Sequence, residues 1–382
     1  MIPSLVDRSQ YPGLGDHVYL NQASLGLIAQ PAATAMHTFL ENVARHGNIY
    51  MSDSDETGYF TTLRGHGAKL FHAHLSNVAI IASASEILGQ FPLLLRLEKG
   101  DSVLAVSSDF PAVTRPWLRQ SLLGNGTVRF VDDLSGCDLT ESLIDAVDEH
   151  TRVISVSMVQ YATGTAVDVA RLARTAAEAG ALLIVDATQA AGAVAVDIST
   201  LLADAVITSG YKWLGGHGGV ALAIVAERLC QQVPVLPGWM SAPTPFEFDA
   251  RIVAFAPDAR RFTLSTMSYV SIAGLSASIG QLLAVGEREI EAHARKLAAL
   301  LIEGVREHGW TPFRDIDSVS ACPHIVALRH EREPAAAAVE RLRTRGIICS
   351  ERGNRVRISL APYNDSNDVS AVVEALRCEG RE

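Results

Sequence analysis

The chain has 382 residues, of which 48% are hydrophobic and 19% are charged, with 29 glycines and 15 prolines. This is the composition of a globular protein of two or three domains, and it excludes a disordered or collagen-like chain. The formal net charge of −10 has the wrong sign for a general nucleic-acid or anionic-membrane surface, so we expect neither as a partner.

The cysteines and the first residues of the chain indicate a reducing compartment. The five cysteines are scattered and form no Cys-x-x-Cys pair, which favours neither a zinc site nor a disulfide framework. They are Cys137, Cys230, Cys322, Cys349 and Cys378. The first residues lack the basic and apolar regions of a signal peptide, and no window reaches about 18 uncharged apolar residues. We therefore expect a cytoplasmic protein.

Apolar runs alternate with helical patterns through the first two thirds of the chain. Residues 1–60 show little periodicity apart from a predicted helix near 31–44. From about residue 77 to residue 226, strands that are apolar at every position are separated by helices, which indicates a sheet covered on both faces. This is a doubly wound α/β domain. The predicted strands are residues 78–82, 102–107, 127–131, 152–159, 182–185, 205–208 and 219–225.

The rest of the chain has a different pattern. A proline-rich irregular stretch at about 227–265 precedes a long helical stretch at 271–308, and residues 310–382 read as strand, helix, strand, helix. We expect four parts. They are an N-terminal segment (1–60), a large α/β domain (61–265), a long linking helical region (266–308) and a small C-terminal α+β domain (309–382).

Ligands of open α/β sheets bind at the carboxyl ends of the strands, so the residues that follow each strand are the candidates for a site. Asp186 follows the apolar strand 182–185. A carboxylate there is costly without a cationic partner, although it could instead cap the next helix. Ser83 and Ser85 follow the first strand and could cap a helix or hold a phosphate. Phe110 follows the second strand, where it could equally pack in the core.

Lys212 is the candidate amine. The chain has only four lysines, and Lys212 lies between Tyr211 and Trp213, just before a glycine cluster. Partial desolvation there lowers the pKa of an amine and makes it a possible nucleophile for Schiff-base chemistry. The alternative is a surface lysine. The other three, Lys69, Lys99 and Lys296, lie in an ordinary turn or on helical stretches.

Four segments together resemble the class V aminotransferase family of pyridoxal-phosphate enzymes of fold type I. Asp-Ala-Thr-Gln at 186–189 is followed by Ser-Gly-Tyr-Lys at 209–212, Tyr-Leu-Asn-Gln-Ala-Ser stands at 19–24, and Arg-Ile-Ser-Leu-Ala-Pro-Tyr-Asn stands at 357–364. The family includes cysteine desulfurases, kynureninases and isopenicillin N epimerase-like proteins. The resemblance implies a large domain with a seven-stranded, mostly parallel sheet, a small C-terminal domain, and an N-terminal segment packed near the active site.

The resemblance also implies a role for each candidate. Lys212 would form a Schiff base with pyridoxal 5'-phosphate and then move the Cα proton, Asp186 would pair with the pyridine nitrogen, and Gln189 would bind the ring oxygen. The phosphate would lie on Ser83, Ala84, Ser85, Ser209 and Tyr211, the ring would stack on Phe110, and Tyr161 would lie near the ring oxygen. Thr266 matches a position that reaches the phosphate of the neighbouring subunit, which implies a homodimer with active sites at its interface.

Substrate contacts are implied in the same way. Arg357 would bind the α-carboxylate of an amino acid as a planar fork, with Asn21 and Ala23 beside the substrate. Arg352, Arg355 and Arg357 could instead form a solvated basic edge.

The departures from the family pattern bear on the reaction. Cys349 lies in an apolar run that leads almost directly into the Arg357 strand, without the mobile loop that carries the cysteine of desulfurases, so we disfavour that chemistry. Phe110 stands in place of a stacking histidine and Tyr211 in place of the histidine before the lysine. These changes favour the isopenicillin N epimerase-like branch. The reactions that we expect share a quinonoid intermediate. Among them we rank β-elimination, as in a C–S lyase, equal to transamination, and epimerisation lower. A non-catalytic partner protein is the remote alternative.

The spacing of the residues favours neither a metal site nor a dinucleotide-binding loop. His72 and His74, near His66, do not share a helix face, so we expect no metal. The Gly13-Leu-Gly15 pair precedes any strand and lacks the third glycine of a dinucleotide-binding loop, so we do not expect an oxidoreductase.

Overall fold

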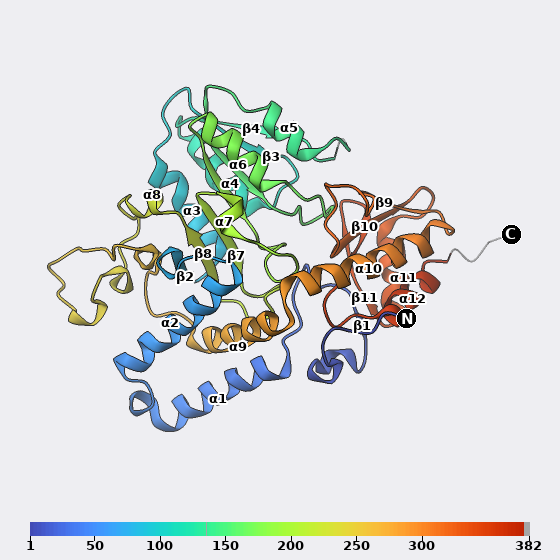
Figure 1. Cartoon of the computed structure of the whole chain (residues 1–382), viewed down its shortest axis with the longest axis horizontal. Helices are drawn as coiled ribbons and strands as arrows, with labels where there is room; N and C mark the ends of the chain where they lie inside the picture. Colours follow the sequence, from blue (N-terminus) through green and yellow to red (C-terminus); the bar gives the residue numbers. More distant parts are fainter. Residues whose placement is uncertain (135, 378–382) are drawn as a thin grey trace.

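A seven-stranded sheet forms the centre of the molecule (Figure 1). The structure is a computed structural model that describes residues 1–134 and 136–377; Cys378 lies outside the described residues. The strand order is β2-β8-β7-β6-β5-β3-β4. Strand β8 runs antiparallel to both of its neighbours, β2 and β7, and the other pairings among these strands are parallel. The strands are β2 (Val78–Ile81), β3 (Ser102–Val106), β4 (Thr127–Val131), β5 (Thr151–Ser157), β6 (Leu182–Asp186), β7 (Ala205–Ser209) and β8 (Ala221–Val225). The predicted mostly parallel α/β sheet is confirmed.

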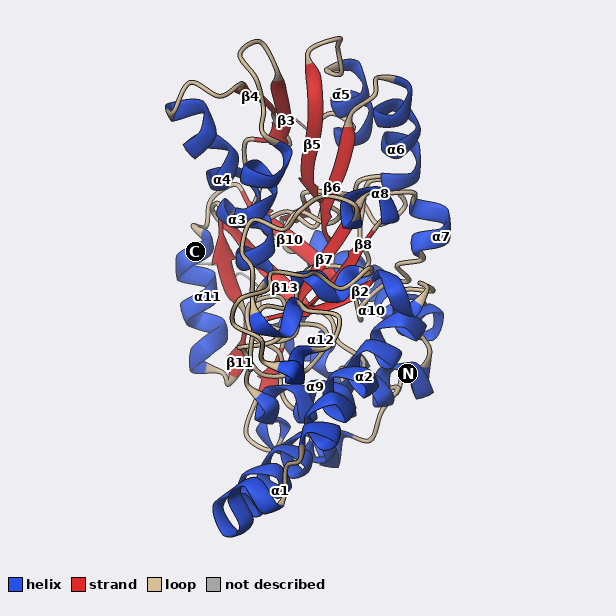
Figure 2. Cartoon of the chain, turned by 90° about the vertical axis from the view of Figure 1, so that its left-hand side faces the viewer, coloured by secondary structure: helices blue, strands red, loops and turns tan. Residues whose placement is uncertain are grey.

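Helices cover both faces of this sheet (Figure 2), which explains why its strands are apolar at every residue. One face packs against α3 and α4, and the other packs against α2, α6 and α9. The helices of this part are α1 (Gln30–His46), α2 (Asp53–Leu70), α3 (Ala84–Leu95), α4 (Pro111–Leu122), α5 (Leu139–Asp145), α6 (Val169–Glu178), α7 (Ile198–Leu201), α8 (Glu227–Cys230) and α9 (Tyr269–Val285).

The N-terminal residues contain a helix that the sequence pattern did not predict. Helix α2 begins after a capping box in which Ser52 and Asp55 bind each other's backbone amides, and such a box stabilises a helix start. Its apolar residues are few and its glycines several, so its helical period is weak in the sequence. Phe60 and Leu63 still pack in the core. The helix crosses residue 60, the predicted end of the N-terminal segment.

The predicted long helical stretch at 271–308 consists of two helices. Helix α9 ends at Val285, and α10 (Glu287–Arg306) continues after a bend of 76°. Gly286 lies between them with φ of 91°, a conformation that glycine adopts without strain. No single helix in the described residues is long and apolar enough to cross a membrane. Helices α9 and α10 reach that length and apolar composition only when they are taken together, as a bent pair.

The C-terminal residues form a second, antiparallel sheet of order β12-β13-β10-β9. It is richer in strands than the predicted strand-helix-strand-helix pattern. Helices α10, α11 and α12 pack against it around the buried Trp310. Further elements are β9 (Trp310–Pro312), β10 (Ile325–His330), α11 (Ala335–Thr344), β11 (Ile347–Ile348), β12 (Ser350–Arg352), β13 (Arg355–Ser359) and α12 (Ser366–Ala375).

The N-terminal segment joins this C-terminal part. Strand β1 (Val18–Tyr19) pairs in parallel with β11, and Asn21 forms a bridge to Ser359 at the end of β13. Residues 19–24 are therefore held beside the end of β13, more than 300 positions later in the chain.

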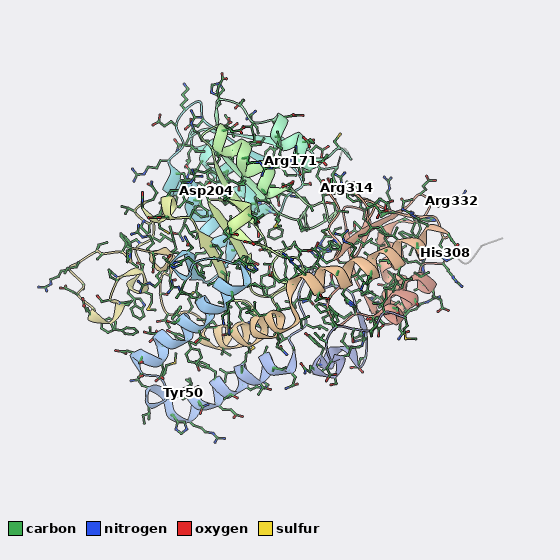
Figure 3. The ribbon with its side chains drawn as sticks, viewed as in Figure 1. Tyr50, Arg171, Asp204, His308, Arg314 and Arg332 are labelled. Carbon is green, nitrogen blue, oxygen red and sulfur yellow. The ribbon has the colours of Figure 1, made fainter. Side chains whose placement is uncertain are left out.

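One buried ion pair links the loop after β4 to the chain after β9. Arg314 (Figure 3) donates from Nη2 to Asp133 Oδ1 at 3.1 Å, and the Asp133 side chain is 0% exposed. Thr163 Oγ1 donates to the other carboxylate oxygen at 2.7 Å. Arg314 also donates to the backbone carbonyls of Gly136 and Cys137.

We predict that Asp133→Asn lowers the free energy of unfolding by about 3 to 5 kcal/mol, because it leaves the Arg314 cation buried without an anion. Urea denaturation followed by circular dichroism measures this loss. Asp249→Asn is the matched control, because its partner Arg251 is 88% exposed and such pairs contribute about 0 to 1 kcal/mol. If both variants lost the same stability, the buried pair would not hold these segments together.

Candidate active site

Ten of the eleven predicted cofactor contacts line one cavity of about 140 Å³ at the carboxyl edge of the large sheet. The edge forms because β6 and β7 are adjacent and parallel, so that the residues ending each strand meet there. The lining residues are Ser83, Ala84, Ser85, Phe110, Ala112, Ser157, Tyr161, Asp186, Thr188, Gln189, Ser209, Tyr211 and Lys212. Thr266 is the exception: it is exposed, in the chain before α9.

Lys212 is buried, so the alternative of a surface lysine is wrong. Its side-chain Nζ lies 5.4 Å from the centre of the Phe110 ring and 5.8 Å from that of Tyr211. Burial lowers the pKa of Lys212 to about 8, although the Asp186 charge acts in the opposite direction. The amine therefore loses its proton more readily than an ordinary lysine does, and the neutral form is the nucleophile.

Asp186 is the buried carboxylate of the cavity. Its Oδ1 accepts a hydrogen bond of 2.8 Å from the backbone N–H of Thr188. The chain turns there, and the next helix begins only at Ile198, so the helix-cap alternative is wrong. Burial raises the pKa of Asp186, while the hydrogen bonds from Thr188 and the Lys212 charge lower it. Lys212 and Asp186 thus influence each other electrostatically across the cavity.

The aromatic wall consists of Phe110 and Tyr161, whose rings meet edge to face at 5.6 Å. Phe110 is 39% exposed, so it lines the cavity and does not pack in the core. The buried Asp109 fixes this wall, because it accepts hydrogen bonds from the Phe110 backbone at 2.6 Å and from the Ser157 backbone at 2.8 Å.

Ser83, Ala84 and Ser85 lie at the start of α3. Ser83 Oγ accepts from the backbone N–H of Glu86 at 3.2 Å, so Ser83 is the helix cap. Ser85 reaches the cavity one residue into the helix. The amides of a helix start bind anions, so capping and phosphate binding are compatible at this place.

The N-terminal segment encloses the cavity from the other side. Gln189 donates from Nε2 to the backbone carbonyl of Ala23 at 3.0 Å, and its Oε1 accepts from Trp213 at 2.8 Å. Gln22 donates to the backbone carbonyl of Lys212 at 3.0 Å. A Cβ at Gly26 would lie 2.2 Å from that same carbonyl oxygen, so only glycine fits there.

Arg357 lies beside the cavity, just behind Tyr161. It is 1% exposed, so the solvated basic edge is wrong for this residue. Its Nη1 donates to the Tyr161 carbonyl at 2.7 Å, and its Nη2 donates to Ser24 Oγ at 2.5 Å and to Asn21 Oδ1 at 3.5 Å. Burial and the neighbouring Arg352 lower the pKa of Arg357 to about 10. Its Nε is buried without a partner.

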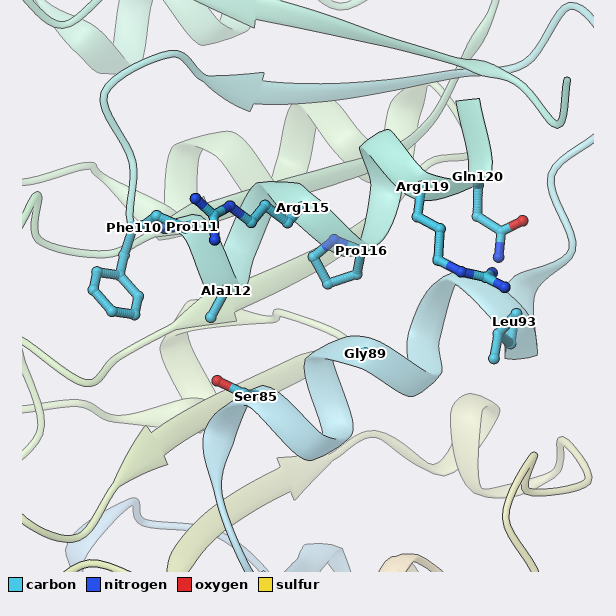
Figure 4. A pocket seen from close by; sticks show the side chains of 10 residues that line it. All are labelled: Ser85, Gly89, Leu93, Phe110, Pro111, Ala112, Arg115, Pro116, Arg119 and Gln120. Carbon is cyan, nitrogen blue, oxygen red and sulfur yellow. The ribbon is translucent and has the colours of Figure 1, made fainter. Parts of the chain in front are cut away.

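An open groove of about 640 Å³ continues from the cavity between α3 and α4 (Figure 4). It shares Ser85, Phe110 and Ala112 with the cavity, and Arg115 and Arg119 lie further along it. The cavity is therefore accessible along one helix pair.

Several site residues escaped the sequence analysis. Ser157, Thr188 and Ala112 line the cavity, and Thr188 Oγ1 accepts from the Ser209 backbone at 3.1 Å. Thr188 stands inside the Asp-Ala-Thr-Gln segment, so its position was visible in the sequence although its role was not. Asp109 precedes Phe110, and no signal in the sequence distinguishes it from a turn residue.

Comparison with known proteins identifies the family. The family model for class V aminotransferases matches residues 18–372. An uncharacterized aminotransferase YcbU of Bacillus subtilis is 26% identical over 97% of this chain and 96% of its own length. A probable cysteine desulfurase of Methanothermobacter thermautotrophicus is 26% identical over 97% of this chain and 96% of its own length. A kynureninase of Deinococcus radiodurans is 32% identical over 71% of this chain and 67% of its own length.

Solved structures agree on the fold. The cystine C-S lyase C-DES, in complex with cysteine persulfide, superimposes with a TM-score of 0.87 at 20% identity over 96% of this chain and 99% of its own. The cysteine desulfurase CsdA of Escherichia coli has a TM-score of 0.84 at 22% identity, over 97% of this chain and 96% of its own. The predicted fold type I architecture is confirmed. The chain belongs to the class V aminotransferase family and is a pyridoxal-phosphate-dependent enzyme.

Proposed function

We propose that the cavity holds pyridoxal 5'-phosphate and that the enzyme acts at the Cα of an amino acid or amino-acid conjugate, by β-elimination of a sulfur group or by transamination. The observation that carries this proposal is the pair of opposite buried charges, Lys212 and Asp186, on one small cavity. An epimerase of the isopenicillin N type is the alternative, and a non-catalytic partner protein is the remote one.

The residues present fit this cofactor. Asp186 is a buried carboxylate that a cationic ring nitrogen would neutralise. The start of α3, with Ser83, Ala84 and Ser85, offers amides and hydroxyls to a phosphate, together with Ser209 and Tyr211. Phe110 offers a flat face to an aromatic ring. Gln189 has one N–H beyond its bond to Ala23, and Tyr161 lies beside it on the cavity; both are candidates for the ring oxygen.

Pyridoxal phosphate, when bound, supplies an electron sink that stabilises negative charge at Cα. Lys212 would hold it through its amine, and as a free amine would carry the Cα proton. Arg357 binds the α-carboxylate of the substrate as a planar fork, with Asn21 and Ala23 beside it. The substrate is therefore an amino acid with a free α-carboxylate.

Desulfurase chemistry is less well supported than elimination or transamination. Cys349 lies directly between β11 and β12, and burial raises the pKa of its thiol to about 12. A thiolate acceptor of sulfur needs a low pKa and an accessible position, which this residue lacks. It fits the role of a small apolar side chain.

We also propose a homodimer and a cytoplasmic location. The segment 231–257 projects from the body of the molecule (Figure 1) and exposes apolar side chains. They include Val233, Phe248, Ile252 and Val253, which are 64% to 74% exposed. Apolar surface of this kind marks an interaction site. Thr266 follows this segment, which supports its proposed contact with the phosphate of the neighbouring subunit.

The lowered pKa of Lys212 gives a test on the protein without cofactor. We predict that acetic anhydride labels Lys212 with a midpoint near pH 8, because only the neutral amine reacts. Mass spectrometry after proteolysis follows the labelling. In Asp186→Asn the midpoint falls below 8, since the carboxylate that favours the ammonium is gone. A midpoint that rises in this variant would contradict the electrostatic link.

The cofactor and its anchor are tested by the visible spectrum. We predict a yellow protein in which borohydride fixes the cofactor on Lys212, whereas Lys212→Ala yields no peptide modified at that position. Lys296→Ala, on the outer helix α10, is the matched control and should match the wild type. A protein that stays colourless with added pyridoxal phosphate would overturn the proposed function.

The products then decide between the reactions. Pyruvate and a thiol from a cysteine S-conjugate indicate a lyase. A requirement for a keto-acid acceptor indicates a transaminase, and formation of the Cα epimer, with the composition of the substrate unchanged, indicates an epimerase.

The dimer is tested by sedimentation equilibrium. We predict about twice the 40.9 kDa mass of one chain, and dissociation with loss of bound cofactor in the double variant Phe248→Asp, Val253→Asp, because charge disfavours a buried apolar contact. Val319→Asp is the control, because Val319 is 92% exposed and lies outside the segment. A monomeric wild type that retains its cofactor would contradict this proposal.

A further inference from the structure

A second guanidinium group lies beside Arg357. Arg352 ends β12, and its Nη2 lies 3.4 Å from Ser24 Oγ, the same oxygen that accepts from Arg357 Nη2 at 2.5 Å. The turn that follows is fixed, because Gly353 and Asn354 both have positive φ, 55° and 56°, which is the signature of a tight two-residue hairpin. The backbone of Arg352 is therefore held in register with β13, where it pairs with Arg355.

The two guanidinium groups donate to neutral oxygens. In the described part of the chain neither Arg352 nor Arg357 forms a salt bridge; their acceptors are a hydroxyl, an amide oxygen and backbone carbonyls. Glu351, the nearest acid in sequence, directs its carboxylate to the backbone of Asn354 at 2.7 Å. Two like charges near one hydroxyl are unfavourable in a half-buried place, and an anionic ligand would relieve this.

The pair lies next to residues that line the cavity. Arg357 donates to the carbonyl of Tyr161, and Gln189 donates to the carbonyl of Ala23, which adjoins Ser24. Tyr161 and Gln189 both line the cavity. The charge of Arg352, like that of Arg357, lowers the pKa of Lys212, so it acts on the reacting end of the cavity.

The third arginine of this face has other partners. Arg355 stacks its guanidinium on the Phe313 ring at 4.4 Å and donates to the Gly353 carbonyl at 3.1 Å. It is part of the packing of the small sheet. It therefore provides a matched control, because it pairs directly with Arg352 on the same hairpin.

We propose that Arg352 binds a second anionic group, on the side chain of the substrate, while Arg357 binds the α-carboxylate. This rests on the proposed function and narrows its substrate class to amino acids, or cysteine S-conjugates, whose side chain carries a carboxylate or a similar anion. Burial supports the division of roles. Arg357 is fully enclosed and suits the group that every substrate shares, whereas Arg352 is half-buried and can meet a side chain of variable length.

The test uses the holoenzyme and two probes that differ in one charge, S-carboxymethylcysteine and S-methylcysteine. The initial change in the visible spectrum, recorded by rapid mixing before turnover, gives a Kd, and kcat/KM is measured beside it. Arg352→Gln is expected to weaken binding of S-carboxymethylcysteine about tenfold to a hundredfold and to leave S-methylcysteine within twofold. Arg352→Lys is expected to lie in between, because it keeps the charge and loses the fork. Arg355→Gln is expected to change neither Kd.

The contrary outcomes are distinct. An equal loss for both probes in Arg352→Gln would mean that Arg352 shares the α-carboxylate, and no loss for either would mean that it has a structural role; both overturn the proposal. Melting temperatures of the variants separate misfolding from lost binding, and Arg352→Met then provides a second neutral variant. Failure of the proposed function would look different, since the wild type would not respond to either probe, and both proposals would fall together.

Discussion

The site depends on two opposite charges buried at the ends of adjacent parallel strands. Burial alone disfavours the charged form of both Lys212 and Asp186, and each partly restores the charge of the other across the cavity. Because β6 and β7 are parallel neighbours, the fold places the two groups at one edge without any special loop. The remaining lining residues then decide what fits between these charges.

The N-terminal segment connects this pair to Arg357. Gln22 and Gly26 bind the backbone around Lys212, Ala23 accepts from Gln189, and Ser24 accepts from Arg357. The same segment is tied to the C-terminal strands by β1. One short stretch of chain thus sets the position of the amine relative to the guanidinium groups, so the two sheets must pack correctly before the site exists.

Sequence reasoning located what depends on local pattern. Fully apolar strands and the residues that end them predicted the sheet, Lys212 and Asp186, because both signals lie within a few residues. It missed the Asp109 and Ser24 contacts, because their partners lie far along the chain and polar residues of this kind are common in turns. It missed the break at Gly286, because apolar positions keep a helical period on both sides, and it missed α2, whose apolar face is sparse.

The aromatic wall bears on which reaction the enzyme favours. Epimerisation requires a proton to return to Cα on the face opposite to the one it left, so a second titratable group or a mobile one is needed on that face. Of the two rings of this wall, Phe110 lies 5.4 Å from Lys212 Nζ and carries no titratable proton, whereas Tyr161 carries a phenolic O–H. Elimination and transamination need proton movement on one face only, which a single amine with a pKa of about 8 can provide. We therefore rank these two proposed reactions above epimerisation, which would need a phenol of the cavity such as that of Tyr161 as the second group, and we propose that the leaving group on the substrate side chain decides between them.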